Sequence, residues 1–154
     1  MKVLTQQNTV KRIPLTIDDV TLTYAGGMGL TPKNEAATDK YIFGTKTATF
    51  NIILWSGSER VDWEKTGVLT GAWGQPLKIE LETGEFSAKD SGGTAWTPAQ
   101  DDPLTISEQV GELGLICKAL SATSDIIHGR VLQYVASPVK LVIVWNMYSE
   151  VVLT

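Results

Sequence analysis

The chain alternates hydrophobic and polar residues with a period of two in several short segments. In residues 77–82, three aliphatic side chains alternate with Lys78, Glu80 and Glu82. Because successive side chains of a strand point to opposite faces, this pattern predicts a strand with its aliphatic side toward a core. Thr83-Gly84 predicts a turn after it, and residues 85–87 predict the returning strand of a hairpin.

Further segments combine hydrophobic and β-branched residues and are separated by Gly, Pro, Asp or Ser. They are residues 19–24, 47–55, 114–120, 126–135 and 139–145. Helical spacing occurs only in residues 34–42, which predict one short helix. Strands at this spacing without long helices between them predict a mainly β fold, built as a compact β-sandwich or a barrel-like domain.

Two stretches rich in glycine and proline predict loops, over residues 24–32 and 89–103. The second is long enough to carry an interaction. Two interpretations stay open for it: an ordinary surface loop, or a loop that becomes ordered only against a partner.

Length and composition indicate one soluble domain. The chain has 154 residues, of which 43% are hydrophobic, enough for one core without disulfides or metal. The net charge is −4, so we expect neither nucleic acid nor an anionic membrane as a partner. No apolar run is long enough to cross a bilayer, and the first residues lack the apolar stretch of a secretory signal.

The beginning of the chain differs in charge from the rest. It contains three basic residues and no acidic residue up to position 17, whereas the remainder has 10 basic and 17 acidic residues. Residues 1–17 therefore predict an extended N-terminal arm that leaves a single β-rich domain, residues 18–154, and lies on another molecule. The alternative is a frayed terminus without a role. The arm residues expected to contact the partner are Lys2, Gln6, Gln7, Lys11 and Arg12.

No catalytic signature occurs. The only histidine, His128, is expected as a partly exposed side chain of the strand 126–135, and the only cysteine, Cys117, as a small buried hydrophobe. One cysteine and no Cys/His cluster exclude a disulfide framework and a zinc site, and no calcium-binding string is present. We therefore expect no enzymatic activity, no metal and no cofactor.

Five tryptophans are many for this length. Trp55, Trp73 and Trp145 lie in apolar surroundings and are expected in the core. For Trp63 and Trp96, which have polar neighbours, a core position and an exposed position both stay open. Because tryptophan is enriched at interfaces, Trp63 and Trp96 are candidate partner-binding residues.

The order of features over residues 67–135 has a parallel in one known family. Gly74-Gln75-Pro76-Leu77 opens a strand that leads to the Thr83-Gly84 turn, and residues 113–120, with Leu-Gly at the start and Ala-Leu at the end, return to the sheet. In this order the chain resembles the head-decoration, or capsid cement, proteins of tailed bacteriophages.

The resemblance implies a structural protein of the virion, made in the host cytoplasm and bound to the outer surface of the capsid. It implies a homotrimer that braces neighbouring subunits of the major capsid protein against the pressure of packaged DNA. Residues 1–17 would correspond to the family's N-terminal arm and add main-chain hydrogen bonds along a capsid sheet edge. On this hypothesis, deleting residues 1–12 leaves the fold intact and abolishes capsid binding.

Three alternatives remain at this point. One is another virion or secreted β module, such as a tail, baseplate or fibre-tip domain. The second is a glycan-binding module that stacks a sugar ring on Trp63 or Trp96. The third is an enzyme of unrecognised type, which a ligand-sized pocket around His128 with converging carboxylates would support. Quenching of tryptophan fluorescence by an oligosaccharide would favour the glycan-binding module.

Overall fold

The computed structural model describes residues 1–4, 11–17, 26–33, 40–54, 68–73 and 76–146. Strands dominate this part of the chain, and a single turn of 3-10 helix covers Ser121–Thr123. The mainly β, compact fold predicted from the sequence is confirmed.

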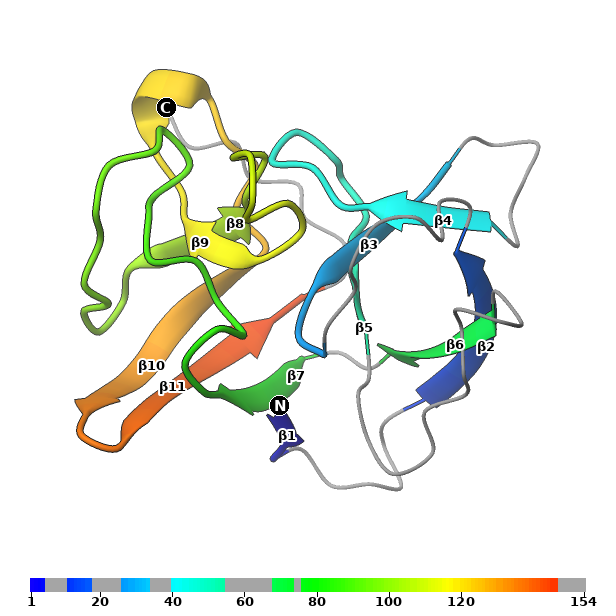
Figure 1. The fold of residues 1–154 in the computed structure, drawn as a ribbon, viewed down its shortest axis with the longest axis horizontal. Helices are drawn as coiled ribbons and strands as arrows, with labels where there is room; N and C mark the ends of the chain where they lie inside the picture. The colour runs from blue at the N-terminus through cyan, green and yellow to red at the C-terminus, as the bar shows by residue number, and fades with distance from the viewer. Residues whose placement is uncertain (5–10, 18–25, 34–39, 55–67, 74–75, 147–154) are drawn as a thin grey trace.

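A six-stranded antiparallel sheet forms one half of the molecule (Figure 1). Its strands lie in the order β1-β7-β11-β10-β8-β9. Their bounds are β1 Lys2–Val3, β7 Leu77–Leu81, β11 Val139–Trp145, β10 Gly129–Ala136, β8 Pro103–Ile106 and β9 Ile116–Lys118. Strands that lie far apart in the chain, such as β1 and β7, are therefore direct neighbours.

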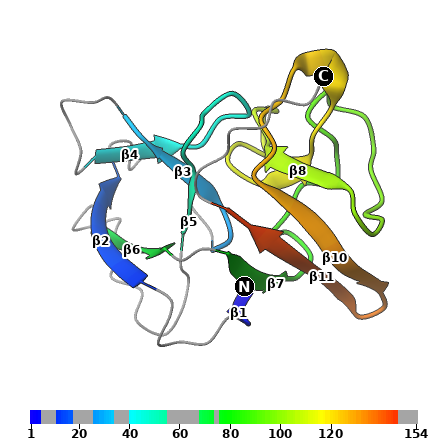
Figure 2. The same ribbon diagram turned by 180° about the vertical axis from the view of Figure 1, so that it is seen from behind.

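The other half is a closed five-stranded barrel, seen beside the sheet from the opposite side in Figure 2. Its strands follow one another in the order β2-β4-β3-β5-β6. Their bounds are β2 Lys11–Ile17, β4 Lys40–Phe43, β3 Gly29–Pro32, β5 Ile52–Leu54 and β6 Val68–Trp73. The β2–β4 pair is parallel, and the other barrel pairs are antiparallel.

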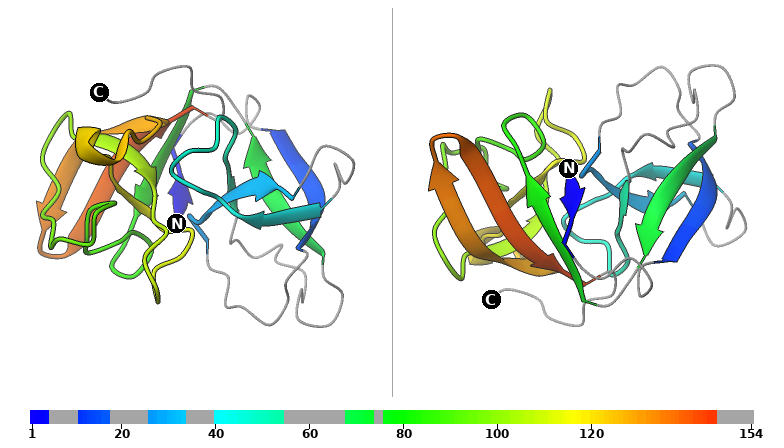
Figure 3. Two further views of the ribbon diagram at one scale, coloured as in Figure 1. Left: turned by 90° about the horizontal axis from the view of Figure 1, so that it is seen from above. Right: turned by 90° about the horizontal axis from the view of Figure 1, so that it is seen from below.

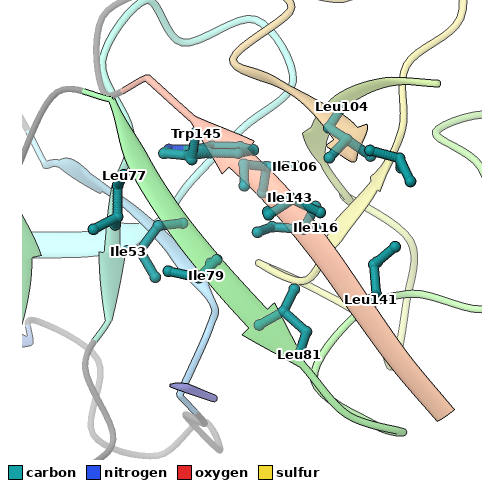
Figure 4. Close-up of a cluster of buried hydrophobic side chains, with 11 residues drawn as sticks. Ile53, Leu77, Ile79, Leu81, Leu104, Ile106, Ile116, Leu141, Ile143 and Trp145 are labelled. Atoms are coloured by element: carbon teal, nitrogen blue, oxygen red, sulfur yellow. The ribbon is translucent and has the colours of Figure 1, made fainter. Parts of the chain in front are cut away.

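The hydrophobic core lies on the inner face of the six-stranded sheet (Figure 4). As the alternation predicts, Leu77, Ile79 and Leu81 point inward and are fully buried. The matching positions of β11 do the same, and Trp145 at the end of that strand is 0% exposed. Ile53 of the barrel strand β5 belongs to the same cluster, so one core joins the two halves.

The barrel and the sheet approach each other closely at a glycine. The Gly29 amide donates to the Gly114 carbonyl over 2.8 Å. A Cβ atom at position 29 would lie 2.3 Å from Cδ1 of Ile106, well inside contact distance. Glycine at this position therefore lets β3 pack directly against the sheet.

Most strand predictions hold, with changed bounds. The bounds of β11 are those predicted, and β7 differs only in ending at Leu81, one residue earlier. The predicted strands 47–55 and 114–120 are shorter in the structure, as β5 and β9, and the predicted strand 126–135 is shifted, as β10. The predicted strand 19–24 lies outside the described residues. The short helix is wrong for residues 40–42, which belong to β4, and the loop over 24–32 is wrong for residues 29–32, which form β3.

The hairpin after β7 is also wrong, although its turn is confirmed. Gly84 has φ +86°, and the Glu85 amide donates to the Glu82 carbonyl over 3.0 Å. The chain does not return along β7 after this turn. Instead, Phe86 forms a parallel bridge with Ile116, next to a hydrogen bond from the Ser87 amide to the Ile116 carbonyl.

The two described parts of residues 1–17 are strands within the fold. The prediction of an arm that leaves the domain is therefore wrong for both parts. β1 pairs with β7 at the sheet edge, as Figure 3 shows, and Leu4 N donates to Lys78 O over 2.8 Å. β2 pairs with β6 from Lys11 to Thr16 and helps to close the barrel. Residues 5–10 lie outside the described residues. Deleting residues 1–12 would therefore remove strand pairing from both halves, so we now expect this deletion to destabilise the fold.

Candidate functional site

The predicted partner-binding residues that the structure describes belong to different strands or loops. Lys2 is exposed on β1 at the edge of the six-stranded sheet, whereas Lys11 and Arg12 belong to β2 of the barrel. Three further candidates, Gln6, Gln7 and Trp63, lie outside the described residues. Their contacts with a partner stay predictions.

Trp96 is partly buried and has partners within the chain. It packs against the core cluster and meets the ring of Phe86 edge-on, with ring centroids 6.3 Å apart. Its indole Nε1 donates to Oδ2 of Asp102 over 2.9 Å. Its polar neighbours in sequence are thus explained by a loop that folds back over the sheet. Contact between the exposed part of the Trp96 side chain and a partner stays a prediction.

Asp102 is the anchor of this loop. Its carboxylate accepts hydrogen bonds from Trp96 Nε1 and from the Ala99 amide, each over 2.9 Å, and forms an ion pair with Lys118 Nζ at 2.9 Å. Burial by itself raises the pKa of Asp102, but the hydrogen bonds from Trp96, Lys118 and Ala99, together with the charge of Lys118, outweigh burial and lower the pKa below its ordinary value.

The substitution Asp102→Asn should lower the free energy of unfolding at pH 7 by about 1.5–3 kcal/mol, because hydrogen bonds to a charged group are lost. A folded-state pKa below the unfolded value stabilises the fold above the unfolded pKa, and this contribution disappears as the pH falls through the folded pKa. The difference between wild type and variant should therefore shrink below about pH 4. Urea denaturation at pH 7 and pH 3 measures it, and a difference that does not depend on pH would contradict this role.

The loop preceding Asp102 is held by the chain itself. Oδ1 of Asp90 accepts hydrogen bonds from the amides of Gly92 and Thr94, over 3.0 and 2.9 Å. Ser91, buried, donates to the carboxylate of Asp125, which is fully buried and also accepts from the Leu120 amide over 2.8 Å. Of the two interpretations of residues 89–103, the structure therefore favours a surface loop with its own contacts.

His128 is buried, which corrects the expectation of a partly exposed strand residue. It precedes β10 and lies between the sheet and the barrel with 1% exposure. Its ring stacks on Trp145, with centroids 5.1 Å apart and planes at 12°. Nε2 lies 2.8 Å from the Ala48 carbonyl and 3.0 Å from Nδ2 of Asn51, and Nδ1 lies 2.9 Å from the Asn146 carbonyl.

These contacts give the cluster a structural use. Asn51 is fully buried, and its backbone carbonyl accepts a hydrogen bond from Nε1 of Trp145 over 3.1 Å. Hydrogen bonds across the junction thus pair buried polar groups of one half with groups of the other, and among the described residues only Oδ1 of Asn51 is buried without a hydrogen-bond partner. His128 contacts Ala48 and Asn51, which precede the barrel strand β5, and stacks on Trp145 of the sheet strand β11. These residues therefore join the barrel to the sheet.

Cys117 is a buried hydrophobe on β9, as predicted. It is 0% exposed, and burial, followed by the negative charges of Asp125 and Asp90, raises the pKa of its thiol. Because the thiolate is the reactive form, Cys117 should react with a maleimide at least 100-fold more slowly in the native protein than in 6 M guanidinium chloride. Mass spectrometry of timed samples measures both rates, and equal rates would contradict this burial.

Other kinds of site find no support in the described residues. Within them, no group of three or more His, Cys, Asp or Glu side chains is placed to hold a metal ion. Nor does this part of the chain contain a helix that is long and apolar enough to cross a membrane.

The side of the six-stranded sheet that faces away from the core carries a different set of side chains. On β7, β11, β10 and β1 the strand register aligns them in rows across the sheet. One row contains Lys2, Glu80, Val142 and Gln133, a second contains Lys78, Val144 and Arg130, and a third contains Lys140 and Val135. We call these nine residues the outer sheet face.

Cations surround apolar residues on the outer sheet face. Lys2, Lys78, Arg130 and Lys140 are exposed, whereas the central Val142 and Val144 are half-buried. Figure 3 shows the four strands that carry them side by side. Residues two apart in a strand share a face, but only the pairing register shows that the outward residues of these four strands form one surface. This surface was therefore not predictable from the sequence.

The chain matches no protein-family model, no curated protein and no solved structure.

Proposed function

We propose that the protein is a structural component of a tailed-bacteriophage virion that binds the outer surface of the capsid as a homotrimer and bridges subunits of the major capsid protein. The observation that carries the proposal is the arrangement of the segments on which the resemblance rests. The strand after Pro76, the turn at Gly84 and the segment 113–120 belong to one compact sheet, as β7, its turn and β9.

The distribution of side chains between the interior and the surface of the sheet supports a role in binding. His128 and Cys117, whose side chains are common in catalysis, are both buried and in contact with the core or the junction. The surface of the six-stranded sheet, in contrast, offers a broad face of exposed and half-buried side chains on a rigid support. Rigid elements of this kind lose little conformational entropy when they bind a partner.

Co-sedimentation with undecorated heads of tailed bacteriophages tests the proposal. The protein should pellet with the heads and raise the temperature at which they release DNA, and light scattering should give the mass of three chains. A protein that stays in the supernatant with every head tested would overturn the capsid assignment. Fluorescence quenching by oligosaccharides in the same preparation would support the glycan-binding module instead.

A further inference from the structure

The charges of the described side chains are segregated between the outer sheet face and the rest of the molecule. The outer sheet face carries four cationic side chains and one anionic side chain, a net charge of +3. All other charged residues with described side chains are four cations and eight anions, a net charge of −4. An acidic protein thus presents a cationic surface on one side of its sheet.

Pairing inside the chain leaves part of this cationic charge for a partner. The described ion pairs engage the amino group of Met1, Lys46 and Lys118, and none involves Lys2 or Lys140. Arg130 donates from Nη1 to the Asp101 carbonyl over 2.9 Å, which holds its guanidinium in place without neutralising its charge. The only carboxylate of the face is Glu80, opposite Lys2 in the register.

The centre of the outer sheet face is apolar and flat. Val142 and Val144 are neighbours on β11, the strand between β7 and β10, and Val135 is 36% exposed on β10. Leu132, the extra residue where the β10–β11 register shifts, is 40% exposed. Short branched side chains on a pleated sheet form a flat surface, and such residues gain free energy when a partner removes them from water.

We propose that the outer sheet face is a docking surface for an acidic protein surface with an apolar centre. The partner's carboxylates would lie against Arg130 and Lys140, and its apolar residues would cover Val142 and Val144. Opposite charges at the rim steer association and fix orientation, while the apolar centre supplies most of the buried area. This inference rests on the proposed function, in which the acidic surface belongs to the capsid exterior.

The same observations disfavour nucleic acid as the occupant. Valine side chains at the centre can neither bond to phosphate nor stack on bases, which nucleic-acid surfaces require. A protein surface satisfies both the charges and the apolar centre.

Matched charge reversals test the docking surface. Lys140→Glu changes the face, and Lys89→Glu makes the same change of net charge at an exposed position outside it. With poly-L-glutamate resin as the probe, Lys140→Glu should weaken binding about tenfold and Lys89→Glu less than twofold. Equal effects of the two variants would overturn the proposal.

The apolar centre and the identity of the occupant need two further measurements. On undecorated phage heads, Val142→Thr, which keeps the branched shape, should weaken binding about threefold, because a hydroxyl replaces an apolar contact. A 20-base-pair DNA duplex should bind at least tenfold more weakly than poly-L-glutamate. Tighter binding to the duplex that Lys140→Glu abolishes would assign the face to nucleic acid and overturn this proposal.

The outcomes separate the two proposals. If wild type ignores phage heads but poly-L-glutamate distinguishes Lys140→Glu from Lys89→Glu, the capsid function fails and the acidic-protein docking surface stands on its own. If wild type, Lys140→Glu and Lys89→Glu bind heads equally, the capsid function stands and the docking surface is wrong. Circular dichroism of each variant confirms that the fold is retained.

Discussion

Replacing Trp145 with alanine should lower the free energy of unfolding by about 3–5 kcal/mol, the usual cost of truncating a large buried aromatic side chain. Trp145 is fully buried at the end of β11 and belongs to the core cluster. It also stacks on His128 and donates to the Asn51 carbonyl across the junction. The substitution therefore removes core contacts and one hydrogen bond between the two halves. Urea denaturation followed by far-ultraviolet circular dichroism measures the loss.

Trp145→Phe is the matched control. Phenylalanine keeps much of the aromatic volume but lacks Nε1, so the Asn51 carbonyl loses its donor, at a cost of about 1–3 kcal/mol. If Trp145→Ala cost no more than Trp145→Phe, burial of the ring would not be what stabilises the junction. The ratio of the two losses thus separates packing from hydrogen bonding.

The size of this effect follows from the position of the residue between two units. A typical domain of this size is stable by about 5–15 kcal/mol, so the loss of 3–5 kcal/mol removes a large fraction. Because Ile53 of the barrel shares the core with the sheet, we expect both halves to unfold together in wild type. In Trp145→Ala the weakened junction should broaden the transition, which a smaller m-value would report.

Local pattern predicted both central strands and the faces of one of them. In β7 the alternation of hydrophobic and polar residues is uninterrupted, so the period of two identifies both the strand and its inward residues. Residues 141–145 of β11 are all hydrophobic, so the sequence predicts a strand there but not which of its faces is buried. The turn at Thr83-Gly84 was also predictable, because glycine takes the required φ +86° without steric cost. These features depend on residues close together in the chain.

Features that depend on distant residues were not predictable. After the Gly84 turn the chain pairs with Ile116 rather than with β7, and nothing in residues 85–87 names that partner. His128 was placed on the wrong surface because the strand was extended to residue 126, whereas β10 begins at Gly129. The cationic outer sheet face depends on the register of four strands, which single-sequence patterns leave open.

The N-terminal segment shows how charge composition can outweigh a weak structural signal. Ile13, Leu15 and Ile17 alternate with other residues and indicate a strand, but Pro14 interrupts the hydrogen-bonding donors and lowers that expectation. The structure pairs Lys11 to Thr16 with β6, with Pro14 opposite Thr70, and Ile17 pairs with Tyr41 of β4. Three basic residues without an acid therefore mark two strands, not an arm that leaves the domain.

Removal of residues 2–4 should accordingly destabilise the protein, by about 2–4 kcal/mol. β1 contributes ladder hydrogen bonds to β7, the Leu4 amide donates to Lys78, and Val3 packs against the core cluster. The amino group of Met1, held beside the carboxylate of Glu85, would lose its position as well. Each net hydrogen bond adds about 1 kcal/mol, and partial burial of a valine adds a similar amount. Thermal and urea denaturation of the shortened protein measure the loss.

Lys2→Ala is the control for this truncation, because the Lys2 side chain is exposed and the substitution keeps the β1 backbone. It should change the free energy of unfolding by less than about 0.5 kcal/mol. The truncation also uncovers the edge of β7, and an unpaired edge promotes association between chains, so the shortened protein should aggregate on heating at a lower temperature than Lys2→Ala. A truncated protein with wild-type stability would restore the interpretation of this segment as a dispensable arm. If the truncated protein loses free energy of unfolding and Lys2→Ala does not, residues 2–4 belong to the folded sheet, where Lys2 is part of the outer sheet face.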